Sequence, residues 1–283
     1  MIPRPPMLGG AGRFVHGVEP GTSRMHDSLQ KMIGFHKRVS AWFDRAVLPR
    51  YTVDGATHYT SSFLPRFVAP RMVVYDVGGG RSPVMSEQDK QGLQLLYVGI
   101  DISDEELRNS PEGVYDRVHV SDLSAFRGSA DADVVICRAV LEHVRDVRRA
   151  FRSLSSILKP GGRLVLFVPC RNALYARLNL LLGDRVKRWL LFSIHPHTRG
   201  CQGFTSFYDQ CTPGRFERIA RENGLVLESR RCYQYNFYLS FFFPFHVVYR
   251  LVSIGLYKVF GDEFCEAFSL CLRRVTTSGE TQQ

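Results

Sequence analysis

The residues most suited to chemistry are an acidic residue and three glycines that directly follow a short apolar run. They read Asp76-Val77-Gly78-Gly79-Gly80. Glycines in such a loop let the backbone approach a ligand closely, and the next helix offers oriented N–H groups at its first turn. The spacing differs from G-x-G-x-x-G, so the pyrophosphate fingerprint is only partly present. The loop therefore predicts a binding site for a dinucleotide, a phosphate or an adenosyl group.

Two further carboxylates each follow an apolar run. Asp101 comes 25 residues after Asp76, at the end of the second run, where a carboxylate can accept hydrogen bonds from ribose hydroxyls. Asp122 and Leu123 follow the third run. There a carboxylate can meet an exocyclic amine while its apolar neighbour lies against the base. Dinucleotide-dependent enzymes and methyltransferases both use this device, so these residues alone leave both classes open.

The segments that position these residues alternate between strand-like and helix-like patterns. The clearest helical stretch is Val140–Leu158, and a turn at Lys159–Gly162 follows it. Strands that alternate with helices imply a parallel sheet covered on both faces. We therefore expect an α/β fold with a Rossmann-like, seven-stranded, mostly parallel sheet. The expected strands are Val73–Val77, Leu95–Ile100, Val118–Val120, Ala132–Ile136, Arg163–Val168, Leu225–Glu228 and Ala267–Leu272.

The ordered set of motifs resembles one family. The set is similar to that of the class I S-adenosylmethionine-dependent methyltransferases, in the type 11-like branch that acts on small molecules. The resemblance covers residues 71–170 and, more weakly, 213–231. It implies S-adenosyl-L-methionine as the cofactor and methyl transfer as the reaction. The motifs that carry it are Asp76–Gly80, Gly99–Ser103, Ser121–Leu123, Ala139–Val144 and Leu158–Gly162.

The resemblance also implies roles for residues around the methionine end of the cofactor. Asp76, Gly78 and Gly80 would line that end, and Arg138 would lie near the sulfonium side of the pocket. One departure from the family pattern is Ser82, which stands where the third loop glycine is usual.

At the adenosine end the resemblance implies four further contacts. Asp101 would hold the ribose, and Ile102 would lie against the adenine. Asp122 would meet the adenine amine, and Leu123 would flank the ring.

Methyl transfer from a sulfonium is an in-line displacement, in which the enzyme mainly aligns nucleophile, methyl group and sulfur. A hydroxyl acceptor benefits from a general base, most often a histidine or a carboxylate. The candidate catalytic residues are His143, at the start of the expected helix, and His195 and His197 in a later insertion. Metal-dependent members place an aspartate at the end of the fourth strand, where this chain has Cys137. We therefore predict no metal.

The net charge of +10 does not indicate a nucleic-acid partner. Residues 1–70, 71–170 and 171–283 carry +5, −1 and +6, so the excess lies outside the cofactor region. Enzymes that methylate base amines carry an Asn/Asp-Pro-Pro-aromatic turn after the fourth strand, where this chain has Cys137–Val140. We expect a small-molecule or lipid-linked acceptor that is methylated at oxygen. The basic and aromatic insertions suit phosphate or carboxylate, so an anionic acceptor stays open. Natural-product, quinone and sugar-type intermediates all stay open.

Composition divides the chain into parts with different expected roles. Pro and Gly dominate the N-terminal arm, and an amphipathic helix over Ser23–Leu48 follows it, ended by Pro49. The expected parts are a flexible arm at 1–22, a helical cap at 23–70, a methyltransferase domain at 71–275 and a tail at 276–283. Within the domain, helical and aromatic insertions at 171–212 and 234–260 would form a lid over the acceptor site.

The aromatic stretch at 237–260 leaves two interpretations open. Pro244, His246, Arg250 and Lys258 interrupt it, and charges at the centre of a bilayer span are costly, so a simple transmembrane helix is disfavoured. The stretch is either a buried helix that forms a pocket wall or an aromatic, basic surface that lies on a membrane.

Two alternatives to a methyltransferase follow from the same residues. A nicotinamide-dependent reductase would use the same fold, but the full glycine fingerprint and a Tyr-x-x-x-Lys pair are missing. A non-catalytic, membrane-peripheral protein is the other. The seven cysteines are odd in number and scattered without a CxxC, which predicts reduced thiols and a cytoplasmic location. Peripheral contact with a membrane stays open. The oligomeric state stays open.

Overall fold

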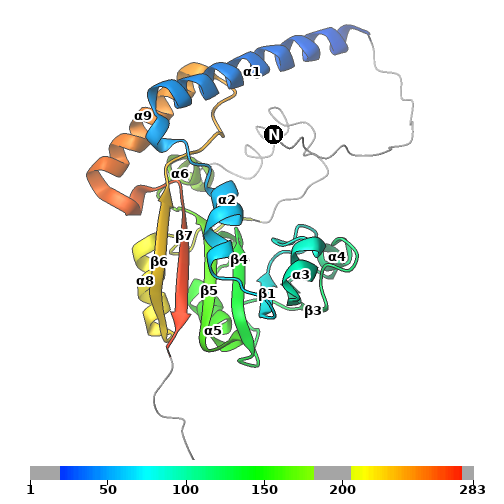
Figure 1. Cartoon of the computed structure of the whole chain (residues 1–283). Coiled ribbons are helices and arrows are strands. Elements are labelled where there is room, and N and C mark those ends of the chain that lie inside the picture. The colour runs from blue at the N-terminus through cyan, green and yellow to red at the C-terminus, as the bar shows by residue number, and fades with distance from the viewer. Residues whose placement is uncertain (1–19, 182–204, 276–283) are drawn as a thin grey trace, which may run out of the picture.

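The computed structural model describes residues 20–181 and 205–275, which build a seven-stranded mixed sheet with helices around it (Figure 1). The strand order is β3-β2-β1-β4-β5-β7-β6. β7 runs antiparallel to both of its neighbours, and the pairs from β3 to β5 are parallel. The prediction of a mostly parallel, seven-stranded sheet is therefore confirmed. The strands are β1 (Val73–Val77), β2 (Leu96–Asp101), β3 (Arg117–Val120), β4 (Ala132–Arg138), β5 (Leu158–Pro169), β6 (Leu225–Tyr233) and β7 (Ala267–Arg274).

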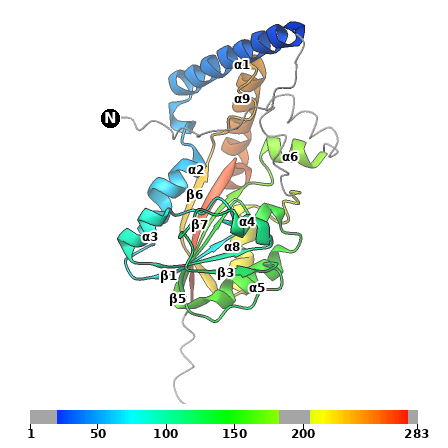
Figure 2. The ribbon, with the colours of Figure 1, turned by 90° about the vertical axis from the view of Figure 1, so that its right-hand side faces the viewer.

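The helices lie on both faces of the sheet and at its upper end (Figures 1 and 2). Four short helical elements connect the first long helix to β1. The α-helices are α1 (Pro20–Val47), α2 (Gly55–His58), α3 (Glu87–Leu93), α4 (Asp104–Arg108), α5 (Val147–Ile157), α6 (Leu174–Leu181), α8 (Pro213–Glu222) and α9 (Phe243–Phe260). Short helical turns lie at Pro49–Tyr51, Tyr59–Phe63, Leu64–Arg66, Leu141–His143 and Gly261–Phe264.

The central strands are apolar on both sides because each face of the sheet carries its own core. In β4, Val135 and Cys137 belong to the cluster that contains Phe151 of α5, whereas Val134 and Ile136 belong to the opposite cluster. Successive side chains of a strand point to opposite faces, so a strand buried on both faces reads as a continuous apolar run. This is why the strand pattern could be recognised in the sequence.

The predicted helix over Val140–Leu158 is wrong at its start. The chain first makes a short 3-10 turn at Leu141–His143, and α5 begins only at Val147. Asp146 caps α5, because its side chain accepts a hydrogen bond from the Arg149 N–H. His143 therefore lies on a turn that precedes the helix.

The predicted turn at Lys159–Gly162 lies inside β5. Ala132 pairs with Leu158 and Val134 pairs with Arg163, so the residues between them form an irregularity in the strand. Gly161 has a φ of 80°, which a glycine adopts without the strain a side chain would bring. The strand therefore starts before the residue that the sequence pattern indicated.

Helices α1 and α9 are far apart in the sequence but lie together above the sheet (Figures 1 and 2). The Ser40 hydroxyl of α1 donates to the Ser240 carbonyl, 3.1 Å away.

Within residues 20–181 and 205–275, no helix is long and apolar enough to cross a membrane. Most of the predicted arm, the segment with His195 and His197, and the tail at 276–283 lie outside the described residues.

Candidate active site

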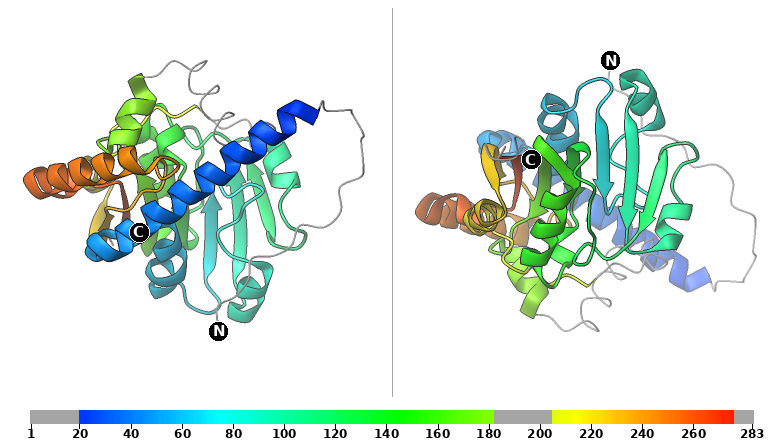
Figure 3. Two further views of the ribbon diagram at one scale, coloured as in Figure 1. Left: turned by 90° about the horizontal axis from the view of Figure 1, so that it is seen from above. Right: turned by 90° about the horizontal axis from the view of Figure 1, so that it is seen from below.

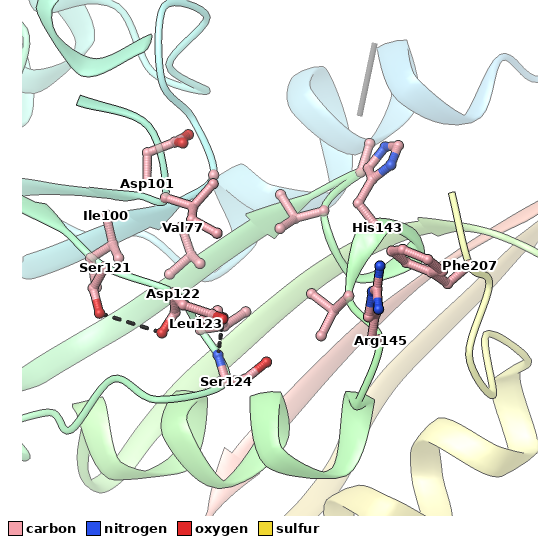
Figure 4. A pocket seen from close by; sticks show the side chains of 15 residues that line it. Val77, Ile100, Asp101, Ser121, Asp122, Leu123, Ser124, His143, Arg145 and Phe207 are labelled. Carbon is pink, nitrogen blue, oxygen red and sulfur yellow. Dashed lines mark hydrogen bonds between the residues drawn. The ribbon is translucent and has the colours of Figure 1, made fainter. Parts of the chain in front are cut away.

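A cavity of about 400 Å³ opens at the carboxyl ends of β1, β2 and β4 (Figure 4). Ligands of open α/β sheets bind at this edge, because the strand order reverses there and the loops diverge. Six of the residues predicted from the sequence line the cavity, and nine others join them. The lining residues are Val77, Gly78, Ile100, Asp101, Ile102, Ser121, Asp122, Leu123, Ser124, Ala139, Val140, His143, Val144, Arg145 and Phe207.

Gly78 forms a cradle that a larger residue would fill. Its φ is +73°, and a Cβ at this position would lie 2.3 Å from Cγ2 of Val140. Its N–H donates to the Ile100 carbonyl at 2.7 Å, which joins the loop after β1 to β2. The backbone of this loop is therefore held close to the cavity with no side chain between them.

Asp101 stands at the end of β2 and takes part in the cavity wall. It is buried, its Oδ1 accepts a hydrogen bond from the Ser103 N–H at 2.9 Å, and burial raises the pKa of its carboxyl. The next residue, Ile102, is 59% exposed although it is apolar. A carboxylate beside an uncovered apolar side chain fits a ligand that has both hydroxyls and an aromatic ring.

Asp122 and Leu123 follow β3 on the same wall. The Asp122 side chain is exposed, and its Oδ1 accepts a hydrogen bond from the Ser124 N–H at 2.8 Å (Figure 4). Leu123 is buried beneath it. This loop turns the carboxylate of Asp122 outward while Leu123 stays in contact with the core.

Asp76 lies behind the cavity rather than in its lining. It is fully buried, and its Oδ2 accepts hydrogen bonds from the Tyr97 hydroxyl at 2.5 Å and the Val84 N–H at 2.8 Å. Burial raises the pKa of this carboxyl, while the bonds from Tyr97 and Val84 lower it. Its Oδ1 has no hydrogen-bond partner among the described residues. The contact to Val84 ties both ends of the glycine loop together.

Two other predicted residues also stand outside the lining. Gly80 has a φ of +44°, and a Cβ there would lie 3.0 Å from Oδ2 of Asp101. The guanidinium of Arg138 donates to the Ser82 carbonyl at 3.3 Å, so it contacts the glycine loop. Ser82, the departure from the family pattern, thus accepts this hydrogen bond from Arg138 through its backbone carbonyl.

His143 lies on the other wall of the cavity. Its Nδ1 is 3.2 Å from the Thr205 carbonyl and 3.3 Å from the Ser206 hydroxyl, and its Nε2 is 3.8 Å from Oε1 of Glu142. The chain after the undescribed gap therefore packs directly against the turn that carries His143. Asp209 from this segment accepts a hydrogen bond from the Val147 N–H at 3.1 Å and so helps to cap α5.

Phe207 and Arg145 complete this wall. The Phe207 N–H donates to the Glu142 carbonyl at 2.7 Å, and the Arg145 guanidinium lies 4.9 Å from the centre of the Phe207 ring. A cation over an aromatic ring holds both groups in place. Figure 4 shows both side chains on the side of the cavity that carries His143.

Glu142 is a buried carboxyl directly beside this wall. It is 4% exposed, its Oε2 has no hydrogen-bond partner among the described residues, and burial raises its pKa to about 8. Burial therefore favours the protonated form of Glu142 near neutral pH in the folded chain.

Beside His143, four of the residues that sequence reasoning missed fall into two groups. Val140 and Val144 belong to the motif Ala139–Val144, and Arg145 follows it directly, so the motif itself could have indicated them. Phe207 comes 62 residues after Arg145, and no local pattern connects the two. Among the described residues, no segment of 234–260 lines the cavity, and no group of three or more His, Cys, Asp or Glu is placed to hold a metal ion.

Comparison with known proteins places the chain in a family. A profile of the family described as "Methyltransferase domain" matches residues 53–229. The ubiquinone biosynthesis O-methyltransferase of Chromobacterium violaceum is 30% identical over 171 residues, which cover 58% of this chain and 68% of that protein. The proteins of the same name from Leptothrix cholodnii and Idiomarina loihiensis are each 27% identical, over 68% and 54% of their lengths and 58% and 44% of this chain.

The solved structure of geranyl diphosphate C-methyltransferase from Streptomyces coelicolor A3(2) is 15% identical and covers 77% of this chain and 76% of that one. Its TM-score is 0.48, which adds nothing to the family assignment. The assignment rests on the family profile, which spans more than half of the chain, and on the match to the Chromobacterium protein. The chain belongs to the class I S-adenosylmethionine-dependent methyltransferases.

Proposed function

We propose that this chain transfers the methyl group of S-adenosylmethionine to an oxygen atom of a small-molecule acceptor. The observation that carries the proposal is one cavity in which Gly78, Asp101 and Asp122 lie on one side and His143 on the other. The name of the curated relatives, ubiquinone biosynthesis O-methyltransferase, supports oxygen as the accepting atom. When bound, the cofactor supplies a methyl group on a sulfonium, which leaves as a neutral thioether.

The residues of the β2 and β3 ends suit the adenosine half of the cofactor. In this proposal the Asp101 carboxylate accepts hydrogen bonds from the ribose hydroxyls, and the Asp122 carboxylate accepts one from the adenine amine. The uncovered side chain of Ile102 and the buried Leu123 lie against the two sides of the ring. The burial of Asp101 makes its hydrogen bonds stronger than they would be in water.

The glycine loop suits the methionine half. Gly78 leaves room for the backbone to contact the ligand, and Gly80 keeps the loop clear of Asp101. Asp76 fixes the shape of the loop through Val84, and Arg138 supports it through the Ser82 carbonyl. In this proposal, Asp76 and Arg138 position the loop instead of contacting the methionine directly.

His143 is the proposed general base. If its Nδ1–H donates to the Thr205 carbonyl, 3.2 Å away, the other ring nitrogen is the one that accepts a proton. It would take the proton of the acceptor hydroxyl as the oxygen attacks the methyl group. His195 and His197, which lie outside the described residues, are the remaining candidates for this role.

The wall around His143 favours a flat acceptor. Val140, Val144 and Phe207 give it an apolar lining, and Arg145 brings a positive charge to the same wall. The ring of an aromatic acceptor, such as a quinone-type intermediate, would stack on this surface, and an anionic substituent would pair with Arg145.

Two measurements test the proposal. Calorimetric titration should show binding of S-adenosylmethionine and S-adenosylhomocysteine but not of NADPH. Incubation with the radiolabelled methyl donor and a series of phenolic quinone precursors should yield O-methyl ethers. Tight NADPH binding without adenosyl binding, or label found only on nitrogen or carbon of the acceptors, would overturn the proposal.

The role of His143 has its own control. His143→Gln should lower kcat strongly at neutral pH and should leave the affinity for S-adenosylhomocysteine nearly unchanged. His119→Gln, at an exposed position of β3 outside the cavity lining, is the matched control and should keep full activity. Full activity of the His143 variant would move the base to His195 or His197.

A further inference from the structure

The helix pair at the upper end of the molecule buries polar side chains and exposes apolar ones. On α1, Ser40 and Asp44 are buried, whereas Phe35 and Trp42 are 56% and 60% exposed. A helix on the surface of a protein in water normally shows the reverse arrangement. Met32, also on α1, is 52% exposed. The exposed face of α1 is therefore an apolar surface that no described residue covers.

α9 shows the same inversion. His246 and Arg250 are fully buried, while Val248, Val252 and Val259 are exposed. Asp44 joins the buried groups, because its two oxygens lie 2.8 Å from Nε2 of His246 and 2.8 Å from Nε of Arg250. These bonds fix α1 on α9, so the outward position of the apolar side chains is built into the packing of the pair.

A row of positive charges runs beside the apolar face of α1. Lys31, Arg38 and Arg45 are exposed and recur every seven residues, so they lie almost on one line along the helix. At about 100° per residue, this row lies roughly 40–60° around the helix from Phe35 and Trp42. None of the three has an ion-pair partner among the described residues.

Among the described side chains of α1 and α9, no exposed carboxylate lies on the same surface. α9 contains no acidic residue, and the only acidic residue among the described side chains of α1 is the buried Asp44. An apolar strip with aromatic side chains next to a basic row complements an anionic lipid surface, where rings enter the interface and Lys or Arg contact phosphates. A second copy of this chain would bring an equal set of positive charges to the contact.

We propose that α1 lies in the plane of an anionic lipid surface, with Met32, Phe35 and Trp42 inserted and Lys31, Arg38 and Arg45 on the headgroups. α1 passes above the edge of the sheet at which the cavity opens (Figure 3, left, and Figure 2). Docking through α1 therefore brings that edge next to the lipid. The lipid contact is separate from the methyltransferase chemistry. It can be disproved while the proposed methyl transfer still holds.

The test uses the full chain with Trp189→Phe, which leaves Trp42 as the single tryptophan. Vesicles of phosphatidylglycerol and phosphatidylcholine in equal parts should shift the Trp42 emission to the blue, and brominated acyl chains should quench it. Vesicles of phosphatidylcholine alone should bind far less, and rising salt should release the protein. An unchanged emission with anionic vesicles at low salt would overturn the proposal.

Charge reversal separates this surface from the overall charge. The triple variant Lys31→Glu, Arg38→Glu, Arg45→Glu should bind anionic vesicles at least about tenfold more weakly. The matched control reverses Arg152, Arg215 and Arg218, which are exposed on α5 and α8, and should bind like the starting protein. An equal loss in both variants would show that net charge alone governs binding and would overturn the assignment to α1.

Two further readouts keep the outcomes distinct. Light scattering should give a monomer; a dimer that Trp42→Ser dissociates would assign the apolar face to a second copy and would overturn the proposal. Titration of the triple variant with S-adenosylmethionine should give the starting affinity, because the substituted residues lie outside the cavity lining. A failure of vesicle binding is thus separable from a failure of the proposed methyl transfer.

Discussion

The edge of the sheet where the cavity opens and the α1–α9 pair place polar and apolar groups in opposite ways. At the sheet, apolar strands fill the core, and the carboxylates of Asp101 and Asp122 come at the strand ends, where they reach the cavity. In the helix pair, the carboxylate of Asp44 is in the interior and Trp42 is outside. The first arrangement suits a ligand taken from water. The second suits a surface that is itself apolar.

The largest effect is expected from removing the buried charge that holds the helix pair. Asp44→Ala leaves Arg250 buried without its carboxylate and should lower the free energy of unfolding by about 3–5 kcal/mol. Unfolding by denaturant measures this change in the free energy of unfolding. Asp104→Ala removes an exposed ion pair to Arg108 and should cost less than about 1 kcal/mol. Equal losses in the two variants would mean that Asp44 does not organise the interior of the pair.

Gly78→Ala should be the strongest single change at the cofactor edge. The new Cβ would overlap Val140 at a positive φ, and overpacking together with backbone strain should cost about 2–5 kcal/mol. The cost should appear in the free energy of unfolding or in weaker binding of S-adenosylhomocysteine by calorimetry. Gly92→Ala in α3, where a Cβ meets nothing within 4 Å, should be neutral or slightly stabilising. An alanine at 78 that leaves both quantities unchanged would contradict the proposed cradle.

The buried carboxyl of Glu142 predicts a pH dependence of stability. Its pKa rises from 4.5 to about 8 on folding, so the unfolded chain releases this proton first as the pH increases. Stability from this group is complete below about pH 4.5 and is lost progressively up to about pH 8. Glu142→Gln should remove this loss and raise the free energy of unfolding by about 3 kcal/mol at pH 7. A variant with the same pH profile as the starting protein would show that Glu142 is ionised in the fold.

The smallest of these effects is expected at the proposed ribose site. Asp101→Ala should weaken binding of S-adenosylmethionine by about 1–3 kcal/mol, because charged hydrogen bonds to the ligand are lost. Calorimetry measures the affinity, and Asp104→Ala at the start of α4 is the control. An unchanged affinity in a folded Asp101 variant would mean that the ribose is held elsewhere.

Much of the fold and six of the fifteen residues that line the cavity could be predicted because their patterns are local. Each of the central strands is a continuous apolar run, and Asp101 and Asp122 follow their strands directly. Family membership then decided between the methyltransferase and the alternatives that the same fold allows, a nicotinamide-dependent reductase and a non-catalytic protein. The sequence pattern placed the start of α5 too early. Asp146 caps this helix, so the helix begins at Val147, and the apolar periodicity did not reveal that boundary.

No spacing of residues in the sequence indicated the contacts between distant segments. Phe207 reaches the cavity through a hydrogen bond to the Glu142 carbonyl, and Asp44 meets Arg250 across 206 residues. The sequence alone determined the sheet, the glycine loop and the carboxylates at the strand ends, because strand periodicity and loop chemistry are properties of neighbouring residues. Only the tertiary structure decided which side chains close the cavity and which face of α1 stays uncovered, because burial depends on what the rest of the chain packs against it.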